Sequence, residues 1–204
     1  MSPFFLGTAP FVSGEIFETI ERYALQTDDC KDAFAKCLDI HSLSELELLV
    51  QKRHTNDRMY WIESGLVRSF YDTDTDDITT GLYQEGDFFC AFSSFFSQKP
   101  STESICTEEP SVLYSISFED LQRLFGLYPE LSHAFCGLYG HLLELHHART
   151  ALLRYRTPHE RYEAFLAHHP HLPNRLKVKH IASYLGIHRV TLCKIRKQLT
   201  HKKA

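Results

Sequence analysis

The sequence predicts an α+β chain in which an N-terminal β-roll or jelly roll is followed by one long helix and a compact helical C-terminal unit. Three observations lead to this prediction. Short β-rich runs separated by turn residues fill residues 46–117. A helical pattern then runs from Pro129 to about Arg154. The residues from Ala151 onwards are strongly basic, unlike the rest of the chain.

The overall composition is that of an ordinary globular protein, with 43% apolar and 24% charged residues. No apolar run approaches the roughly 20 residues of a membrane-spanning helix, and no Lys or Arg precedes Arg22 to form the basic start of a secretory signal. We therefore expect a cytoplasmic protein with no membrane partner. Without close spacing, the cysteines are expected to be reduced structural thiols: Cys30, Cys37, Cys90, Cys106, Cys136 and Cys193.

The net charge of −4 conceals two opposite halves. Residues 151–204 hold 12 Lys/Arg and 2 Asp/Glu, a net of +10, whereas residues 1–150 hold 10 Lys/Arg and 24 Asp/Glu, a net of −14. Such asymmetry is typical of an acidic module joined to a basic tail that meets a polyanion. A basic surface that only faces solvent would have the same charge. The motif within the tail therefore has to distinguish a polyanion-binding tail from such a surface.

The first half of the chain is expected to change from helix to strand. Ser13 to Leu38 has apolar residues at helical spacing. The start of the strand region is open, because the segment from Ser42 to Glu45 could instead begin a helix as a capping box. The predicted strands are Leu46–Lys52, Met59–Ile62, Leu66–Tyr71, Ile78–Tyr83, Phe88–Ala91, Ser104–Thr107 and Val112–Ser117.

A short helix is predicted from Phe118 to Phe125, and Pro129 suits the first turn of a long one. Along the long helix, apolar positions alternate spacings of four and three, which is typical of a paired dimerisation helix. The alternative is a single helix packed on its own domain. The predicted dimerisation positions are Leu131, Phe135, Leu138, Leu142, Leu145, Arg149 and Leu152, with Arg149 the one break in the seam.

The dipeptide Thr157-Pro158 is expected to end the long helix and to mark a hinge. The predicted organisation is thus an N-terminal effector-type roll with leading helices at 1–128, a dimerisation helix and hinge at 129–156, and a DNA-binding unit at 157–204.

The basic tail carries a helix-turn-helix pattern between Val178 and Lys197. Gly186 lies at the predicted turn, where a positive φ would strain other residues. The second helix has the character of a helix that enters the major groove. The predicted inward residues are Ile181, Ala182, Leu185, Ile187, Leu192 and Ile195.

Double-stranded DNA is therefore the expected partner. Arg189 is the first choice for reading a base, because a guanidinium can bond guanine through two hydrogen bonds, and Lys194 is the second. The complete predicted base-reading set is His188, Arg189, Val190, Thr191, Cys193 and Lys194. Phosphate contacts are expected from Lys177, Lys179, Ser183, Arg196 and Lys197.

This order of elements, with Arg161-Tyr162, the run from Ile181 to Ile187, the run from Thr191 to Arg196, and the turn at 62–68, resembles the Crp/Fnr family of bacterial transcription regulators. The resemblance covers the chain from about residue 28. It implies a homodimer that pairs through the long helix and reads an inverted repeat. It also implies a cyclic-nucleotide-binding-like roll, a winged helix-turn-helix, and base-reading positions at Arg189 and Lys194. RNA polymerase is a further candidate partner.

The effector region departs from that family. Members that bind cyclic AMP have a Gly-Glu pair and an Arg that neutralises the phosphate. Here Gly86-Asp87 opens the stretch, Glu103 stands near the expected Arg, and Lys99 is the only nearby cation. An unpaired buried phosphate would be unfavourable, so we predict no cyclic-nucleotide binding. The candidate pocket residues are Gly86, Asp87, Phe88, Phe89, Ser101 and Thr102.

Whether a small-molecule effector exists stays open, because the aromatic residues after Gly86 fit either a core or an apolar pocket. No cofactor and no metal site is predicted, since His146-His147 and His168-His169 are adjacent pairs whose side chains diverge on a helix. An enzyme is not expected, because the roll contains no His-x-His and only His54 lies within residues 42–132. The alternative function is a ligand-binding module that regulates a protein partner.

Overall fold

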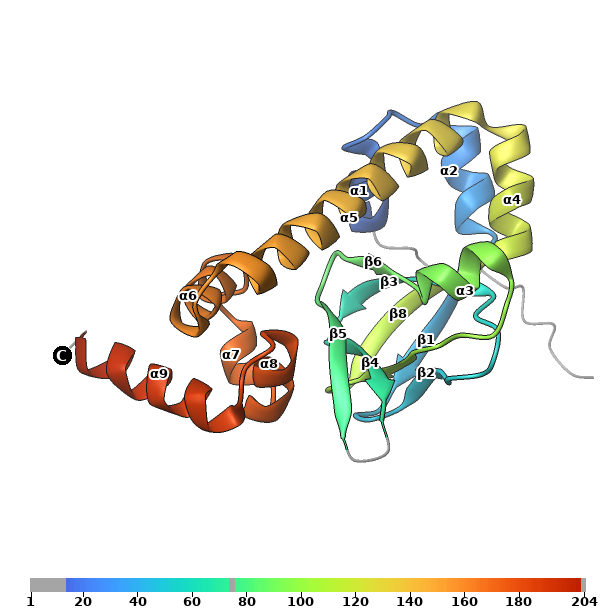
Figure 1. Ribbon diagram of the computed structural model, residues 1–204. Coiled ribbons are helices and arrows are strands. Elements are labelled where there is room, and N and C mark those ends of the chain that lie inside the picture. The colour runs from blue at the N-terminus through green and yellow to red at the C-terminus, as the bar shows by residue number, and fades with distance from the viewer. Residues whose placement is uncertain (1–13, 74–75, 203–204) are drawn as a thin grey trace, which may run out of the picture.

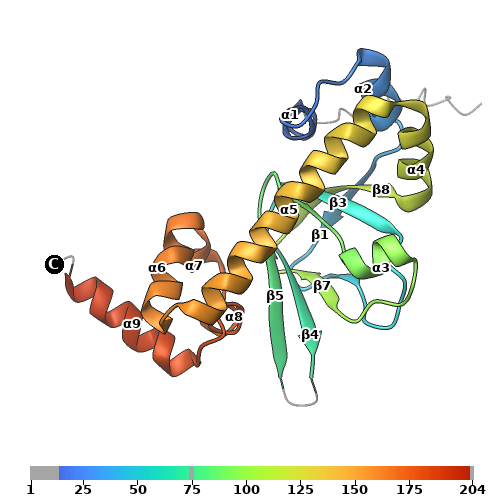
Figure 2. The same ribbon diagram turned by 45° about the horizontal axis from the view of Figure 1, so that its top comes forward.

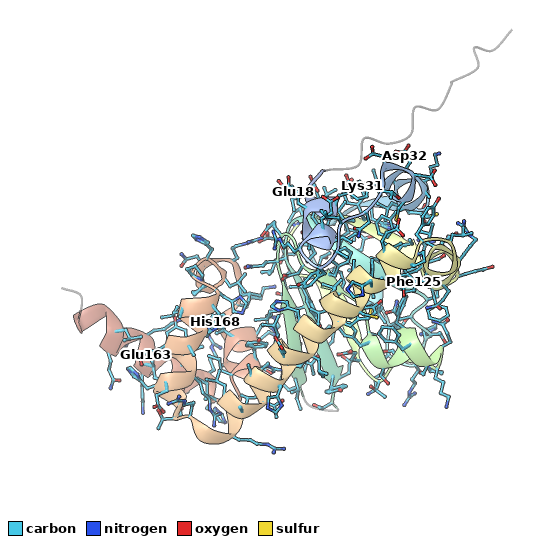
Figure 3. All side chains as sticks on the ribbon, turned by 90° about the horizontal axis from the view of Figure 1, so that it is seen from above. Glu18, Lys31, Asp32, Phe125, Glu163 and His168 are labelled. Atoms are coloured by element: carbon cyan, nitrogen blue, oxygen red, sulfur yellow. The ribbon has the colours of Figure 1, made fainter. Side chains whose placement is uncertain are left out.

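The structure is a computed structural model that describes residues 14–73 and 76–202 of the 204-residue chain. The residues before Gly14, part of the predicted N-terminal module, and two residues of the acidic turn lie outside the described ranges. Figure 1 shows two bodies joined by one long helix: the β-roll with its leading helices, and the C-terminal helices. Figure 3 shows Glu163 and His168 of the second body at the end opposite to Lys31 and Asp32 of the first.

The predicted N-terminal helical region is two helices, α1 (Gly14–Glu21) and α2 (Asp28–Ala35), rather than one. Thr27 precedes α2, and its side chain accepts a hydrogen bond from the Cys30 amide and so caps the helix. Buried residues of both helices pack in the same core as the start of the long helix: Ile16, Ile20, Cys30, Phe34, Leu131, Ala134 and Phe135.

The roll consists of two four-stranded antiparallel sheets, with strand orders β1-β8-β3-β6 and β2-β7-β4-β5. All seven predicted strand runs contain a strand. The remaining strand, β1, was not predicted. It includes Ser42 and Leu43, so the alternative that this segment begins a helix as a capping box is wrong. The strands are β1 (Asp39–Leu43), β2 (Leu48–Val50), β3 (Arg58–Ser64), β4 (Val67–Asp72), β5 (Asp77–Tyr83), β6 (Phe88–Phe89), β7 (Ser104–Thr107) and β8 (Ser111–Ser117).

The aromatic stretch after β6 forms a short helix, α3 (Phe92–Ser97), that the sequence pattern did not indicate. Phe88, Phe89 and Phe95 are at most 3% exposed, so these rings belong to the core. Phe95 contacts Phe118 edge-on, and Phe89 stacks on Tyr60 and Tyr83.

After the roll come α4 (Phe118–Leu127) and the long helix α5 (Pro129–Tyr155), which confirms the predicted helix from Pro129. Ser117 caps α4 by accepting a hydrogen bond from the Asp120 amide. Figure 2 shows α5 running along the roll and onward to α6.

The C-terminal body consists of α6 (Pro158–His168), α7 (Leu172–Arg175), α8 (Val178–Tyr184) and α9 (Arg189–Lys202). All strands of residues 14–73 and 76–202 precede α4, so the wing that the family resemblance implies has no counterpart in this described part of the body. In the same ranges, no helix has both the length and the apolar character needed to cross a bilayer.

A candidate DNA-binding surface and its docking to the roll

The helices α8 and α9 are joined by a tight turn at Gly186, whose φ is +61°. Glycine adopts this backbone conformation without the steric cost that a Cβ brings. The Ile187 amide donates to the Ala182 carbonyl across the turn, and Ala182 is 2% exposed where the helices cross. The predicted inward residues are confirmed: Ile181, Ala182, Leu185, Leu192 and Ile195 are buried, and Ile187 packs against them.

One residue of α6, Arg161, binds the turn between α8 and α9. Arg161 donates from one guanidinium nitrogen to the Leu185 carbonyl at 3.1 Å and to the Gly186 carbonyl at 3.3 Å. These carbonyls end α8 and would otherwise lack helix partners.

Thr157 and Glu160 form a capping box at the start of α6, with Pro158 in its first turn. The predicted hinge dipeptide is thus also the capped start of a helix.

The outer face of α9 is open to solvent. His188, Arg189, Cys193 and Lys194 are exposed, Val190 is 61% exposed, and Thr191 is partly exposed. All six predicted base-reading residues therefore present at least part of their side chains on or beside the first turns of one helix. A cationic helix face of this kind can offer hydrogen-bond donors to base edges.

The predicted phosphate contacts divide into two groups. Lys177, Lys179 and Lys197 are exposed, and only a long 3.4 Å contact links Lys177 to Glu45. Ser183 and Arg196 are different, because their polar atoms are already bound within the chain. The Ser183 hydroxyl accepts from the Thr79 amide at 2.9 Å, and Arg196 Nε donates to the Tyr162 hydroxyl at 2.9 Å. Both residues are engaged within the chain in this structure, and their phosphate contacts stay a prediction.

The helix α8 packs on the edge strand β5 of the roll, and Leu66 and Leu82 of the roll join its apolar core. A buried charged cluster lies beside this contact. Arg68 donates to Glu108 at 2.5 Å and to Asp77 at 3.1 Å, and His180 of α8 lies 3.7 Å from each of these carboxylates. Burial and the Arg68 charge lower the pKa of His180, so its neutral form is favoured.

Arg175 of α7 forms a second link between the two bodies. Its guanidinium binds Glu85 at 2.6 Å and Glu109 at 2.6 Å, and it also donates to the Gly65 carbonyl at 3.0 Å. The hydrogen bonds that Arg175 donates to both carboxylates raise its pKa. Sequence spacing gave no sign of this contact, because its partners are remote in the chain.

The predicted effector-pocket residues do not line one cavity. Phe88 and Phe89 are core residues, Ser101 donates to the Glu103 carbonyl, and Thr102 is exposed. The Asp87 carboxylate accepts from the Gln84 amide in the turn that contains Gly86. Burial raises the pKa of Asp87 to about 6. These residues form a turn and part of the core, and an effector-pocket role for Gly86, Asp87, Phe88, Phe89, Ser101 and Thr102 stays a prediction.

The interior of the roll beside β5 contains a carboxylate. Glu103 accepts from the Thr80 hydroxyl at 2.9 Å, and burial raises the pKa of Glu103. Gly81 makes room here for a neighbouring side chain, because a Cβ at this position would lie 2.5 Å from the Tyr83 hydroxyl oxygen and 2.6 Å from Ser69 Oγ. Tyr83 thus occupies the interior that a residue larger than glycine would fill.

The predicted dimerisation seam is largely turned inward. Leu131, Phe135 and Leu138 are at most 4% exposed in the core of their own chain, and Leu142 packs against the same core. The alternative of a helix packed on its own domain is therefore correct for this half. Arg149 is bound to the roll, Leu152 is half-buried, and Leu145 is 50% exposed. A four-three repeat cannot reveal which partner it faces.

The cysteines are free thiols. Cys30, Cys90 and Cys106 are buried, as expected of structural thiols, and burial raises the pKa of each. Cys37 is partly exposed, and Cys136 and Cys193 are exposed. Within the described ranges, no group of three or more His, Cys, Asp or Glu residues is arranged to hold a metal ion.

Comparisons with known proteins agree with this architecture. Residues 40–128 match the family described as cyclic nucleotide-binding domain. FixK2 from Bradyrhizobium japonicum superposes with a TM-score of 0.73 at 17% identity, covering 81% of this chain and 86% of FixK2. No curated protein matches by sequence.

Two further solved structures have the same fold. The c-di-GMP responsive global regulator CLP from Xanthomonas campestris gives a TM-score of 0.67 at 18% identity, covering 87% of this chain and 93% of CLP. A CooA variant from Carboxydothermus hydrogenoformans gives 0.67 at 16% identity, covering 91% and 84%. Residues 40–128 of this chain thus match the cyclic nucleotide-binding domain, and the chain shares the fold of these Crp/Fnr-type regulators.

Proposed function

We propose that the chain is a transcriptional regulator that binds double-stranded DNA in a sequence-specific manner in the cytoplasm. The observation that supports this most directly is the open face of α9, where Arg189 and Lys194 are exposed on a helix whose opposite side is buried. The regulators with the same fold give the proposal its class, since CLP is described as a global regulator that acts on gene expression.

The proposed active form is a homodimer that reads an inverted repeat. Leu131, Phe135 and Leu138 of the predicted seam are buried in their own chain, whereas α5 has a second stripe at spacings of four and three on its exposed side. Leu143 at its centre is 71% exposed, and short side chains at two positions would let two helices approach closely. The proposed interface residues are Cys136, Gly140, Leu143, His147, Thr150 and Arg154.

Pairing along this stripe would set two α9 helices at a fixed separation, roughly 34 Å for successive major grooves. The test is fluorescence anisotropy with promoter fragments identified by genome-wide mapping of bound sites. We expect affinity to fall steeply with salt, because phosphate contacts release counterions. Salt-insensitive binding, or none at any promoter, would contradict the proposal and favour a protein partner.

We further propose that the roll does not bind cyclic AMP or cyclic GMP. The half-buried Glu103 carboxylate would repel a cyclic phosphate, and the neighbouring interior is occupied by Tyr83. Titration calorimetry with both nucleotides is expected to give no heat of binding. Micromolar affinity for either would overturn this part of the proposal.

A further inference from the structure

The edge strand β5 has a bulge that leaves backbone groups without strand partners. The register between β4 and β5 shifts after Ser69, which pairs with Gly81, so that Phe70 pairs with Thr79 and Thr80 is the extra residue. Edge strands expose amide and carbonyl groups that need partners. In this chain, partners for this edge come from α5 and α8 rather than from another strand.

Arg149 of α5 supplies most of them. Its guanidinium donates to the Thr80 carbonyl at 2.5 Å, to the Thr79 carbonyl at 3.2 Å and to the Tyr184 carbonyl of α8 at 3.1 Å. The guanidinium carbon also lies 4.2 Å from the centre of the Tyr184 ring. One side chain thereby joins the long helix, the roll and the first helix of the DNA-binding unit.

Ser183 completes the same contact from α8. Its hydroxyl oxygen accepts from the Thr79 amide and donates to the Asp77 carbonyl at 3.3 Å. The bulge thus has both its amide and its carbonyls bound by side chains of the docked elements. This contact involves α8 but not the exposed face of α9, so docking leaves the reading residues Arg189 and Lys194 open.

We propose that Arg149 is a positioning residue that fixes the orientation of the α8–α9 pair relative to α5 and the roll without any bound ligand. The effect on DNA binding rests on the proposed function, whereas the contact of Arg149 with the roll and α8 is independent of it. Because α5 is also the proposed dimer helix, a fixed angle between α5 and α9 determines the separation of the two reading helices. Arg149 would then control which spacing of half-sites the dimer accepts.

The first experiment measures the contact without DNA, by hydrogen exchange of the full-length protein. Arg149→Ala is expected to speed exchange about tenfold or more in peptides covering 77–83 and 178–185, while β8 stays protected. Arg156→Ala is the matched control, since Arg156 is exposed and pairs only with Glu160 among described side-chain contacts. Unchanged exchange at 77–83 in Arg149→Ala would overturn the proposal, whether or not the protein binds DNA.

The second experiment separates positioning from general stability. Wild-type protein and variants are titrated, with no added ligand, against inverted repeats whose central spacer varies by single base pairs. The wild type is expected to prefer one spacing by about tenfold or more, and Arg149→Ala to reduce that preference to about twofold while its preference for the half-site sequence persists. Equal spacing selectivity in both proteins would overturn the positioning role.

Two further variants keep the test valid if Arg149→Ala fails to fold. Arg149→Lys keeps the charge but cannot reach three carbonyls with a planar fork, so it should lose spacing selectivity partly. Ser183→Ala removes only the hydroxyl that accepts from Thr79 and should speed exchange at 77–83 alone. If the wild type binds no DNA at all, the proposed function fails, and the exchange result alone decides whether Arg149 fixes the unit.

Discussion

The long helix α5 and the helix pair α8–α9 each have one side packed within the chain and one side exposed to solvent. The same residue types occur on both sides but make different contacts. On α5, Leu138 is buried in its own core whereas Leu143 is 71% exposed. In the helix pair, Arg196 is bonded to Tyr162 whereas Arg189 is exposed. The role of each position is therefore revealed by the partner that its side chain contacts and not by its residue type.

The largest expected effect lies on the docked side, at Arg68. Its side chain is 4% exposed and its partner Glu108 only 1%. Arg68→Ala would leave Glu108 and Asp77 without their shared cation, so we expect a loss of about 3–5 kcal/mol in the free energy of unfolding. Urea denaturation measures this, with Arg123→Ala, an exposed pair with Asp120, as the control near zero. A loss below about 1 kcal/mol at Arg68 would show that this cluster contributes little to stability.

The two sides of α5 give the next largest difference. Leu138→Ala creates a cavity in the core and should lower the unfolding free energy by about 2–5 kcal/mol. Leu143→Ala should change monomer stability by less than about 0.5 kcal/mol but weaken dimerisation. Denaturation and sedimentation equilibrium, run on both variants, separate the two effects. If Leu138→Ala instead dissociated a dimer at unchanged monomer stability, the buried assignment would be wrong.

The two arginines of α9 sharpen the comparison within one helix. Arg189→Ala should cost about 1–3 kcal/mol of DNA-binding free energy and relax specificity at one base pair. Arg196→Ala should cost stability, about 1 kcal/mol for its lost hydrogen bonds, with base preference unchanged. Binding to a panel of single-base variants of the site measures both. Altered base preference in Arg196→Ala would mean that its docked position opens on DNA.

A smaller effect than at Arg68 or Leu138 is expected in the turn at Asp87, whose pKa burial raises to about 6. The folded state then holds this proton more tightly than the unfolded state, so Asp87 lowers stability as pH rises from about 4 to 6 and keeps it lowered above that range. Asp87→Asn retains an acceptor for the Gln84 amide. We expect the variant to gain about 1–2 kcal/mol relative to wild type between pH 4 and pH 7.5 in urea denaturation. A pH-independent difference would contradict the assignment.

Local patterns predicted the elements whose signals are themselves local. The strand runs from Leu46 to Ser117, the helix from Pro129, and the turn at Gly186 all follow from residue periodicity and backbone preference. β1 was missed because its two apolar residues, Ile40 and Leu43, lie three apart and so do not alternate as in a strand, and because its partner β8 is about seventy residues away. α3 was missed because an aromatic-rich segment can be buried as a strand, a helix or a loop, so its composition does not indicate a helix.

The sequence pattern predicted which positions of α9 face solvent, but not the contacts that the DNA-binding unit makes with the rest of the chain. Exposed positions of α9 follow from the helix-turn-helix pattern alone. Ser183 and Arg196 have the composition of phosphate contacts, but their partners, Thr79 and Tyr162, come from other elements. The role of Arg149 likewise depends on a bulge at Thr80 that no periodicity marks.

The bulge in β5 also has a consequence for solubility. While α5 and α8 are docked, Ser183 binds the Thr79 amide and Arg149 binds the carbonyls of Thr79 and Thr80. Undocking would uncover these groups beside the apolar residues Leu66 and Leu82, and such an edge is a template for pairing with other chains. Variants that free the DNA-binding unit should therefore aggregate more readily than wild type, and in this chain the same contact that orients α9 also guards against self-association.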